Sequence, residues 1–217
     1  MDKRFVFALL IILGLFVGYF YVTKKDTSQT DNGSTAQASN HTVGAGNKKV
    51  TLVEYGDFQC PVCSDYFVIL KEIKSKYGDD ITFQFSHFPL DSIHPNARGA
   101  SRAAEAAGNQ GKFFEMHDLL YQNQQIWSSS SNAKELFGSY AQQINLDMAK
   151  FDADYIDELT NDVINADLDA GKAVGVTGTP GFILNGRLLE DNERRSFDEL
   201  VKTIDAEIAK VSAAPQN

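Results

Sequence analysis

The chain has only two cysteines, Cys60 and Cys63, and they stand three residues apart between two regular elements. Residues 50–55, just before them, are rich in β-branched and aromatic side chains, which predicts a strand. From residue 60 to residue 77 apolar side chains recur at spacings of three and four, which predicts a helix. Residues 81–88 alternate between apolar and polar side chains, which predicts a second strand. The chain therefore contains the start of a strand–helix–strand unit, with a Cys-x-x-Cys motif at its first junction.

The position of the two cysteines favours redox chemistry. Pro61 suits the first helical position, so Cys60 should lie at the helix N-terminus, where free N–H groups and the helix dipole favour a thiolate. Cys63, one turn on, should lie on the same face, about 5–6 Å away and within disulfide reach. We therefore expect Cys60 to be the exposed sulfur of low pKa and Cys63 to be the resolving partner. An inert structural disulfide, or a pair of buried thiols, is the alternative that the spacing leaves open.

A metal site at the cysteines is disfavoured. Two cysteines cannot supply a four-cysteine zinc site, and the histidines at positions 41, 87, 94 and 117 show no His-x₃-His spacing. We expect neither a metal nor a cofactor.

Glu54 lies on the first predicted strand, six residues before Cys60 and between the apolar residues Val53 and Tyr55. Burial beneath the cysteines would raise its pKa and allow it to exchange a proton with Cys63. The alternative is a glutamate at the end of a strand, facing solvent.

Another turn is encoded by Gly178-Thr179-Pro180-Gly181, which precedes a predicted strand at residues 182–184. Proline cannot donate to a strand ladder, and the glycines indicate a tight turn. The spacing alone does not favour a cis bond before Pro180, because most X-Pro bonds are trans.

The rest of the globular part is mainly helical. The pattern is helical from residue 94 to about residue 174, with helices expected at residues 97–107, 112–123, 132–144 and 161–174. The strand at residues 182–184 turns at Asn185-Gly186 and resumes at residues 187–189, which predicts a hairpin. A last helix should begin at Ser196, with Glu199 completing a capping box.

The N-terminal part differs from this globular pattern. Residues 5–22 form an uncharged apolar run that, as a helix, would rise about 27 Å, enough to cross a bilayer core. An uncleaved anchor is favoured over a signal peptide, because the run exceeds the usual apolar region of about 7–15 residues and no small-x-small site follows closely. Residues 23–47 are polar and read as a flexible linker. We thus expect an anchor at 1–22, a linker at 23–47 and one domain at 48–217.

Charge argues against one class of partner. The chain carries 20 Lys and Arg against 29 Asp and Glu, a net charge of −9, so a general basic surface for nucleic acid is not expected. Flanking lysines and arginines are balanced around residues 5–22, so charge does not set the orientation of an anchor.

Several motifs together resemble the DsbA-like class of thioredoxin-fold proteins. They are Cys60-Pro61-Val62-Cys63 after a strand, the segments 94–107 and 111–121, and the stretch from Gly175 through Pro180 to Asn185-Gly186-Arg187. The resemblance covers about residues 48–210. It implies an α/β thioredoxin-like fold with an inserted helical domain at about 94–174, here preceded by an N-terminal transmembrane helix.

The resemblance also implies an activity and roles for particular residues. It implies a thiol:disulfide oxidoreductase outside the cytoplasm, with Cys60 as nucleophile and Cys63 as resolving cysteine. Pro180 matches a cis-proline beside the disulfide, Thr179 would offer backbone groups to an extended substrate, and Glu54 matches an acidic residue before the motif. Val62 stands where the best-known member has histidine, so a less extreme oxidant is expected.

The function expected from these observations is that of a membrane-tethered dithiol oxidase. Its substrates would be reduced secreted or cell-envelope proteins, and a membrane quinone-linked oxidase would reoxidise it. The protein would be a single-pass protein of the cell membrane, held in the bilayer through residues 5–22 with its domain on the extracytoplasmic side. A reductase or isomerase with the same site is the first alternative. A tethered chaperone or binding module with a passive cysteine pair is the second.

Overall fold

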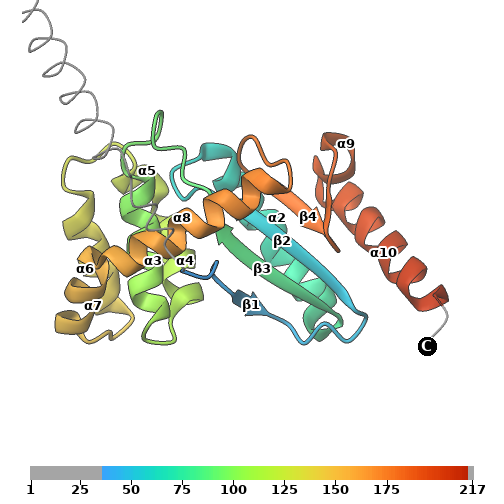
Figure 1. Cartoon of the computed structure of the whole chain (residues 1–217), viewed down its shortest axis with the longest axis horizontal. Helices are drawn as coiled ribbons and strands as arrows, with labels where there is room; N and C mark the ends of the chain where they lie inside the picture. Colours follow the sequence, from blue (N-terminus) through green and yellow to red (C-terminus); the bar gives the residue numbers. More distant parts are fainter. Residues whose placement is uncertain (1–35, 215–217) are drawn as a thin grey trace, which may run out of the picture. The chain divides into compact units, whose positions relative to one another are not determined.

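The computed structural model describes residues 36–214, in which helices surround a mixed β-sheet (Figure 1). The predicted anchor at residues 5–22 lies outside the described residues. Among the helices at 36–214, none is both long and apolar enough to span a bilayer.

The sheet has the order β1-β3-β2-β4-β5. Its central strand, β2 (Val50–Gly56), runs parallel to β3 (Ile81–His87) and antiparallel to β4 (Gly181–Leu184). β5 (Arg187–Leu188) completes the predicted hairpin with β4. Because β2 has neighbours on both sides, its C-terminal end, where the cysteine motif begins, is held from two directions.

Helices cover both faces of this sheet. The motif helix α2 (Pro61–Tyr77) buries Phe67, Leu70, Ile73 and Tyr77, the apolar positions at spacings of three and four. A short 3-10 turn, η1 (Gly78–Asp80), leads from α2 into β3. Figure 1 shows α8 (Glu158–Ala173) lying across one face of the sheet, with α2 behind the other.

The helical block between β3 and β4 begins with helices that lie at one end of the sheet, to the left in Figure 1, and the two helices after the hairpin lie at the other end. The elements of the block before α8 are α3 (Ala97–Gly108), α4 (Phe113–Gln122), α5 (Gln124–Trp127), α6 (Ala133–Gln143) and α7 (Met148–Ile156). After the hairpin come α9 (Asp191–Arg194) and α10 (Phe197–Ala213). At the start of α10 the Ser196 hydroxyl accepts a hydrogen bond from the Glu199 N–H at 3.2 Å, which is one half of the predicted capping box.

The predicted linker is wrong at its C-terminal end. His41–Val43 form β1, which pairs antiparallel with β3, so the folded part begins before residue 48. Buried acids explain why so polar a segment is ordered. The Ser39 N–H and hydroxyl donate to the carboxylate of Asp167 at 2.8 and 2.6 Å, and Asp167 is only 1% exposed.

Candidate active site

Cys60 and Cys63 begin α2, as the sequence predicts. Cys60 is the N-cap with extended backbone, Pro61 follows at the first helical position, and Cys63 lies in the first turn. Both cysteines are free thiols in this structure. Cys63 is fully buried, and Cys60 is only 5% exposed, so the prediction that Cys60 is exposed is wrong. The reason is that a turn from the far end of the sequence lies against its sulfur.

That turn is the one at Thr179 and Pro180, which are joined by a cis peptide bond. The Cys60 thiol donates to the Thr179 carbonyl oxygen at 3.5 Å. The Thr179 hydroxyl is buried and forms no hydrogen bond of standard geometry within residues 36–214, but it is close enough to the Cys60 sulfur to lower the pKa of that thiol. The cis geometry agrees with the family resemblance and differs from what spacing alone favours.

The pKa values of the two thiols are shifted in opposite directions. A hydrogen bond from the Cys63 thiol lowers the pKa of Cys60 to about 5, against the opposing effect of burial. The Thr179 side chain and the N–H groups of Cys63 and Val62 lower it further. Burial raises the pKa of Cys63 well above its ordinary value, and the hydrogen bond to Cys60 and the nearby Glu54 raise it further. At neutral pH the reduced pair therefore holds one thiolate, on Cys60, and one thiol, on Cys63.

Glu54 is buried, as predicted, and is only 1% exposed. It lies on β2 between Phe85 of β3 and Phe182 of β4. Its Oε1 atom is buried with no hydrogen-bond partner in the described part of the chain. Burial raises the pKa of Glu54 to about 8, and although the Lys74 ammonium lowers it, a charged Cys60 raises it. The carboxyl is thus protonated at neutral pH, and its charge, when it ionises, raises the pKa of Cys63.

Pro61 and Val62 form the outer side of the motif. Both are exposed, and the Val62 side chain is 49% exposed. A cleft of about 470 Å³ lies along the Thr179–Pro180 turn, and residues 175–182 and 188–191 and Arg194 line it. The motif thus exposes an apolar side chain, Val62, and the cleft opens along the turn that contacts Cys60.

Sequence reasoning did not find the residues that hold the loop before Cys60. Gln124, on α5, donates from Nε2 to the carbonyl oxygens of Phe58 and Cys60 at 2.7 and 2.9 Å. Gln59 donates to the Ser128 carbonyl oxygen at 2.7 Å. These bonds join the helical block to the motif, and no local pattern signals them because the partners are more than sixty positions apart.

A buried carboxylate also organises this loop. Asp57 is fully buried and accepts hydrogen bonds from the N–H groups of Gln59 and Leu90 and from His94 Nδ1, at 2.7, 2.9 and 2.7 Å. A carboxylate with three donors is a stable anchor for a loop that must hold its shape. The position of Asp57 directly after the first strand is the signal that could have indicated it.

His41, His87 and Glu105 form the group of possible metal ligands within residues 36–214, with ligand atoms all within 4.8 Å of one another. Both histidine Nε2 atoms already bond to Glu105 Oε1, at 2.5 and 2.7 Å. A metal at His87 Nε2 would move the ring proton to Nδ1, which is buried with no acceptor within residues 36–214. The cluster is therefore better described as a hydrogen-bonded triad than as a metal site.

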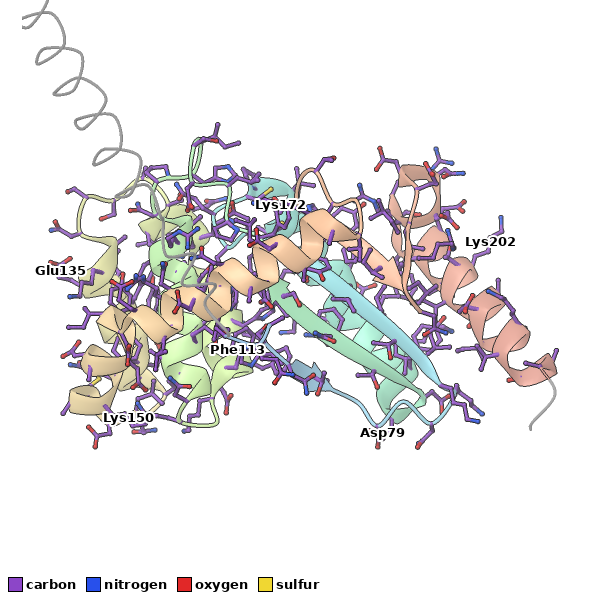
Figure 2. All side chains as sticks on the ribbon, in the orientation of Figure 1. Asp79, Phe113, Glu135, Lys150, Lys172 and Lys202 are labelled. Carbon is purple, nitrogen blue, oxygen red and sulfur yellow. The ribbon has the colours of Figure 1, made fainter. Side chains whose placement is uncertain are left out.

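The triad fastens β1 to the helical block. The His41 ring stacks on Phe113 of α4 with centroids 3.5 Å apart, and Figure 2 labels Phe113 beside β1. Burial raises the pKa of Glu105, but the hydrogen bonds from His41 and His87 outweigh it and lower the pKa to about 2. The other two histidines bond elsewhere, His94 to Asp57 and His117 to Asp118.

Comparison with known proteins identifies relatives for most of the described chain. A family model described as thioredoxin matches residues 36–206. The Na⁺/H⁺ antiporter NhaA 1 of Salinispora arenicola is 39% identical over 147 residues, which are 68% of this chain and 22% of that protein. The chain spans only about a quarter of the length of the curated relatives it matches, 22–24% for several of them.

Solved structures show the same fold. BdbD from Bacillus subtilis, in its oxidised form, matches with a TM-score of 0.70 at 22% identity, over 80% of this chain and 97% of that one. A thioredoxin-like oxidoreductase from Silicibacter pomeroyi matches with a TM-score of 0.65 at 23% identity, over 81% of this chain and 94% of that one. The thioredoxin-like α/β fold with a helical insertion is thereby confirmed.

Proposed function

Since the chain belongs to the thioredoxin family, we propose that it is a thiol:disulfide oxidoreductase that works as a membrane-tethered dithiol oxidase outside the cytoplasm. The proposal rests on the pKa values of the two thiols, which are shifted in opposite directions. The pKa of Cys60 is lowered to about 5, and that of Cys63 is raised well above its ordinary value. A stabilised Cys60 thiolate stabilises the reduced protein, and a stable reduced form makes the disulfide an oxidant.

The reaction begins with the disulfide between Cys60 and Cys63. A substrate thiolate attacks Cys60 Sγ, a mixed disulfide forms, and the sulfur–sulfur bond to Cys63 breaks. Cys63 leaves into a fully buried site, where it needs a proton. Glu54, whose pKa of about 8 keeps it protonated at neutral pH, is the group that supplies this proton.

The second step releases the product. A second substrate thiolate attacks the substrate sulfur of the mixed disulfide, and Cys60 leaves as a thiolate, which its low pKa favours. The substrate loses two electrons and gains a disulfide, while the enzyme disulfide becomes a thiolate and a thiol. The Thr179–Pro180 turn and its cleft lie where an extended substrate chain would bind.

The cellular setting is part of the proposal. The apolar run at residues 5–22 supports a membrane anchor, and an oxidising compartment is where such a pair can act on other proteins. The substrates would be reduced secreted or cell-envelope proteins, with a membrane quinone-linked oxidase as reoxidant. The antiport named for the curated relatives is not carried over, because the chain spans about a fifth of the first of them.

The experiment that tests this function is oxidation of a reduced, unfolded protein by the full-length chain in detergent, with Cys60→Ser and Cys63→Ser as variants. The oxidase proposal expects stoichiometric disulfide formation by the oxidised wild type and none by Cys60→Ser. Cys63→Ser should form none either, because a single cysteine cannot hold the disulfide that accepts the two electrons of the substrate. Equal disulfide formation by wild type and both variants would contradict the proposal.

A further inference from the structure

Arg194, the last residue of α9, contacts the turn that lies against Cys60. Its Nη1 atom donates to the Pro180 carbonyl oxygen at 3.1 Å. The side chain is 19% exposed and lines the cleft beside the turn. A charged donor on a backbone carbonyl forms a stronger hydrogen bond than a neutral donor does, so this contact restrains the turn.

The same guanidinium reaches the motif helix. Its central carbon lies 5.9 Å from the ring centre of Tyr66 on α2 and 5.8 Å from that of Phe182 on β4. Tyr66 stands three residues after Cys63, so the arginine connects the helix that bears the cysteines with the turn that touches them. Asp191, one turn earlier on α9, accepts from Nη2 and fixes the guanidinium from outside.

We propose that Arg194 is a positioning residue, which holds the Thr179–Pro180 turn against Cys60 and so sets the redox equilibrium of the cysteine pair. The inference rests on the thiol–disulfide exchange proposed above and adds to it a residue outside the motif.

The link from Arg194 to Cys60 is short. The Pro180 carbonyl that Arg194 holds is one peptide unit from the Thr179 carbonyl, which accepts from the Cys60 thiol at 3.5 Å. Release of Pro180 would therefore move both polar groups of Thr179, its carbonyl and its hydroxyl. The hydroxyl is one of the groups that lower the pKa of Cys60, so its displacement should raise that pKa.

Fold stability alone does not account for an arginine at this position. Its Nε atom is buried and has no hydrogen-bond partner in the described part of the chain, which is a cost to the folded state. A lysine would give one ammonium, whereas the arginine both donates to the Pro180 carbonyl and lies 5.9 and 5.8 Å from two ring centres. The planar, forked group suits the task of joining a carbonyl to an aromatic pair.

The test compares Arg194→Met, Arg194→Lys and the control Arg195→Met in the full-length chain in detergent. Arg195 is the neighbouring arginine and is exposed, so its loss removes a similar charge without touching the turn. The readouts are the Cys60 pKa, from the ultraviolet absorbance of its thiolate, the equilibrium with glutathione, and KM and kcat for a reduced protein substrate. Near-ultraviolet circular dichroism reports whether each variant is folded.

Arg194→Met should raise the Cys60 pKa by about one unit and shift the glutathione equilibrium about tenfold toward a weaker oxidant. KM should rise more than kcat falls, because the turn binds substrate, and Arg194→Lys should lie between this variant and wild type. Arg195→Met should match wild type in every readout.

A folded Arg194→Met with the wild-type Cys60 pKa and glutathione equilibrium would overturn the proposal. If Arg194→Met does not fold, Arg194→Lys decides in the same way, since wild-type values in that variant would also overturn it. The Cys60 pKa separates this inference from the proposed function. It tests Arg194 even if the wild-type pair fails to exchange with glutathione, a result that would refute only the function.

Discussion

The Sγ atom of Cys60 lies 3.5 Å from the carbonyl oxygen of Thr179, a residue 119 positions later in the chain. The two meet because β2, which leads into the cysteine motif, pairs with β4, which follows the Thr179–Pro180 turn. Because β2 and β4 pair antiparallel, the start of α2 and the turn lie at the same end of the sheet. The acidity of Cys60 depends on this meeting as well as on its place at a helix N-terminus.

Thr179→Val should weaken the Cys60 thiolate. The substitution keeps the shape of the side chain and the backbone carbonyl but removes the hydroxyl that lowers the pKa of Cys60. We expect that pKa to rise from about 5 by about one unit, and the disulfide to become a weaker oxidant. Thr177→Val, at an exposed position two residues earlier, is the control. Titration of the thiolate absorbance checks this, and identical curves for Thr179→Val and wild type would count against the role of the hydroxyl.

Glu54→Gln should slow the attack on the oxidised enzyme in a pH-dependent way. In the proposed mechanism protonated Glu54 supplies the proton that Cys63 takes up, so it would act below its pKa of about 8. We expect the ratio of wild-type to Glu54→Gln rates to be about 10² below that pH and to fall toward one above it. Glu72→Gln, at an exposed position on α2, is the control. Stopped-flow measurement of both rates against pH checks this, and a ratio that does not change with pH would rule out the role.

The same substitution should make the reduced protein more stable at neutral pH. The pKa of Glu54 is higher in the folded protein than its ordinary value of 4.5, so stability is fully present below 4.5 and is lost as pH rises toward about 8. Glutamine does not ionise, so Glu54→Gln should remove this loss and gain on the order of 2–3 kcal/mol at pH 7. Urea unfolding at pH 4 and pH 7 measures the difference. If Glu54→Gln is less stable than wild type at pH 7, burial is not the main influence on the free energy of the Glu54 carboxyl in the folded protein.

Glu105 should have the opposite pH dependence. Its pKa is lowered from 4.5 to about 2 in the folded protein, so its contribution is present above pH 4.5 and lost as pH falls toward 2. We expect wild type to exceed Glu105→Gln in stability by on the order of 2–3 kcal/mol at pH 7, and the gap to close in that acid range. Acid unfolding of both proteins measures the gap. A gap that stays constant down to pH 2 would refute the ionic role of the triad.

Ser39→Ala tests the revised start of the domain. The hydroxyl of Ser39 donates to the buried carboxylate of Asp167 at 2.6 Å, so its loss removes one of the three hydrogen bonds from Ser39 and His87 that this carboxylate accepts. We expect a loss of about 1–3 kcal/mol in the free energy of unfolding. Ser75→Ala, at an exposed position on α2, should have little effect. Chemical denaturation measures both, and equal stability of the two variants would mean that the Ser39 hydroxyl contributes nothing to the stability of the fold.

Periodicity in the sequence was sufficient to predict the elements that bury one face. The apolar spacing of α2 and the alternation of β3 predicted both elements to within a residue or two of their ends. β1 was missed because His41–Val43 is short and polar, and it is ordered by contacts with Glu105, Asp167 and β3 that no local pattern encodes. α7 was not resolved as a separate helix, since the segment around Phe151 is rich in acidic residues and buries little else.

In the candidate site, too, the sequence predicted local arrangements and missed contacts between distant segments. Cys60, Cys63 and Glu54 stand close in sequence, so their order along a strand and a helix predicted their arrangement. The prediction that Cys60 is exposed was wrong, because the Thr179–Pro180 turn that covers it comes from the other end of the domain. Gln124 and Arg194 were missed for a related reason, because each acts through a backbone carbonyl far away or on another element.

The reduction potential of the Cys60–Cys63 pair tests the central claim most directly. It is obtained by equilibrating the full-length chain in detergent with glutathione at defined ratios of thiol to disulfide. A pKa of about 5 for Cys60 predicts a potential more oxidising than about −200 mV, as an oxidase needs. A potential at or below about −270 mV would contradict the oxidase and place the protein among the reductants.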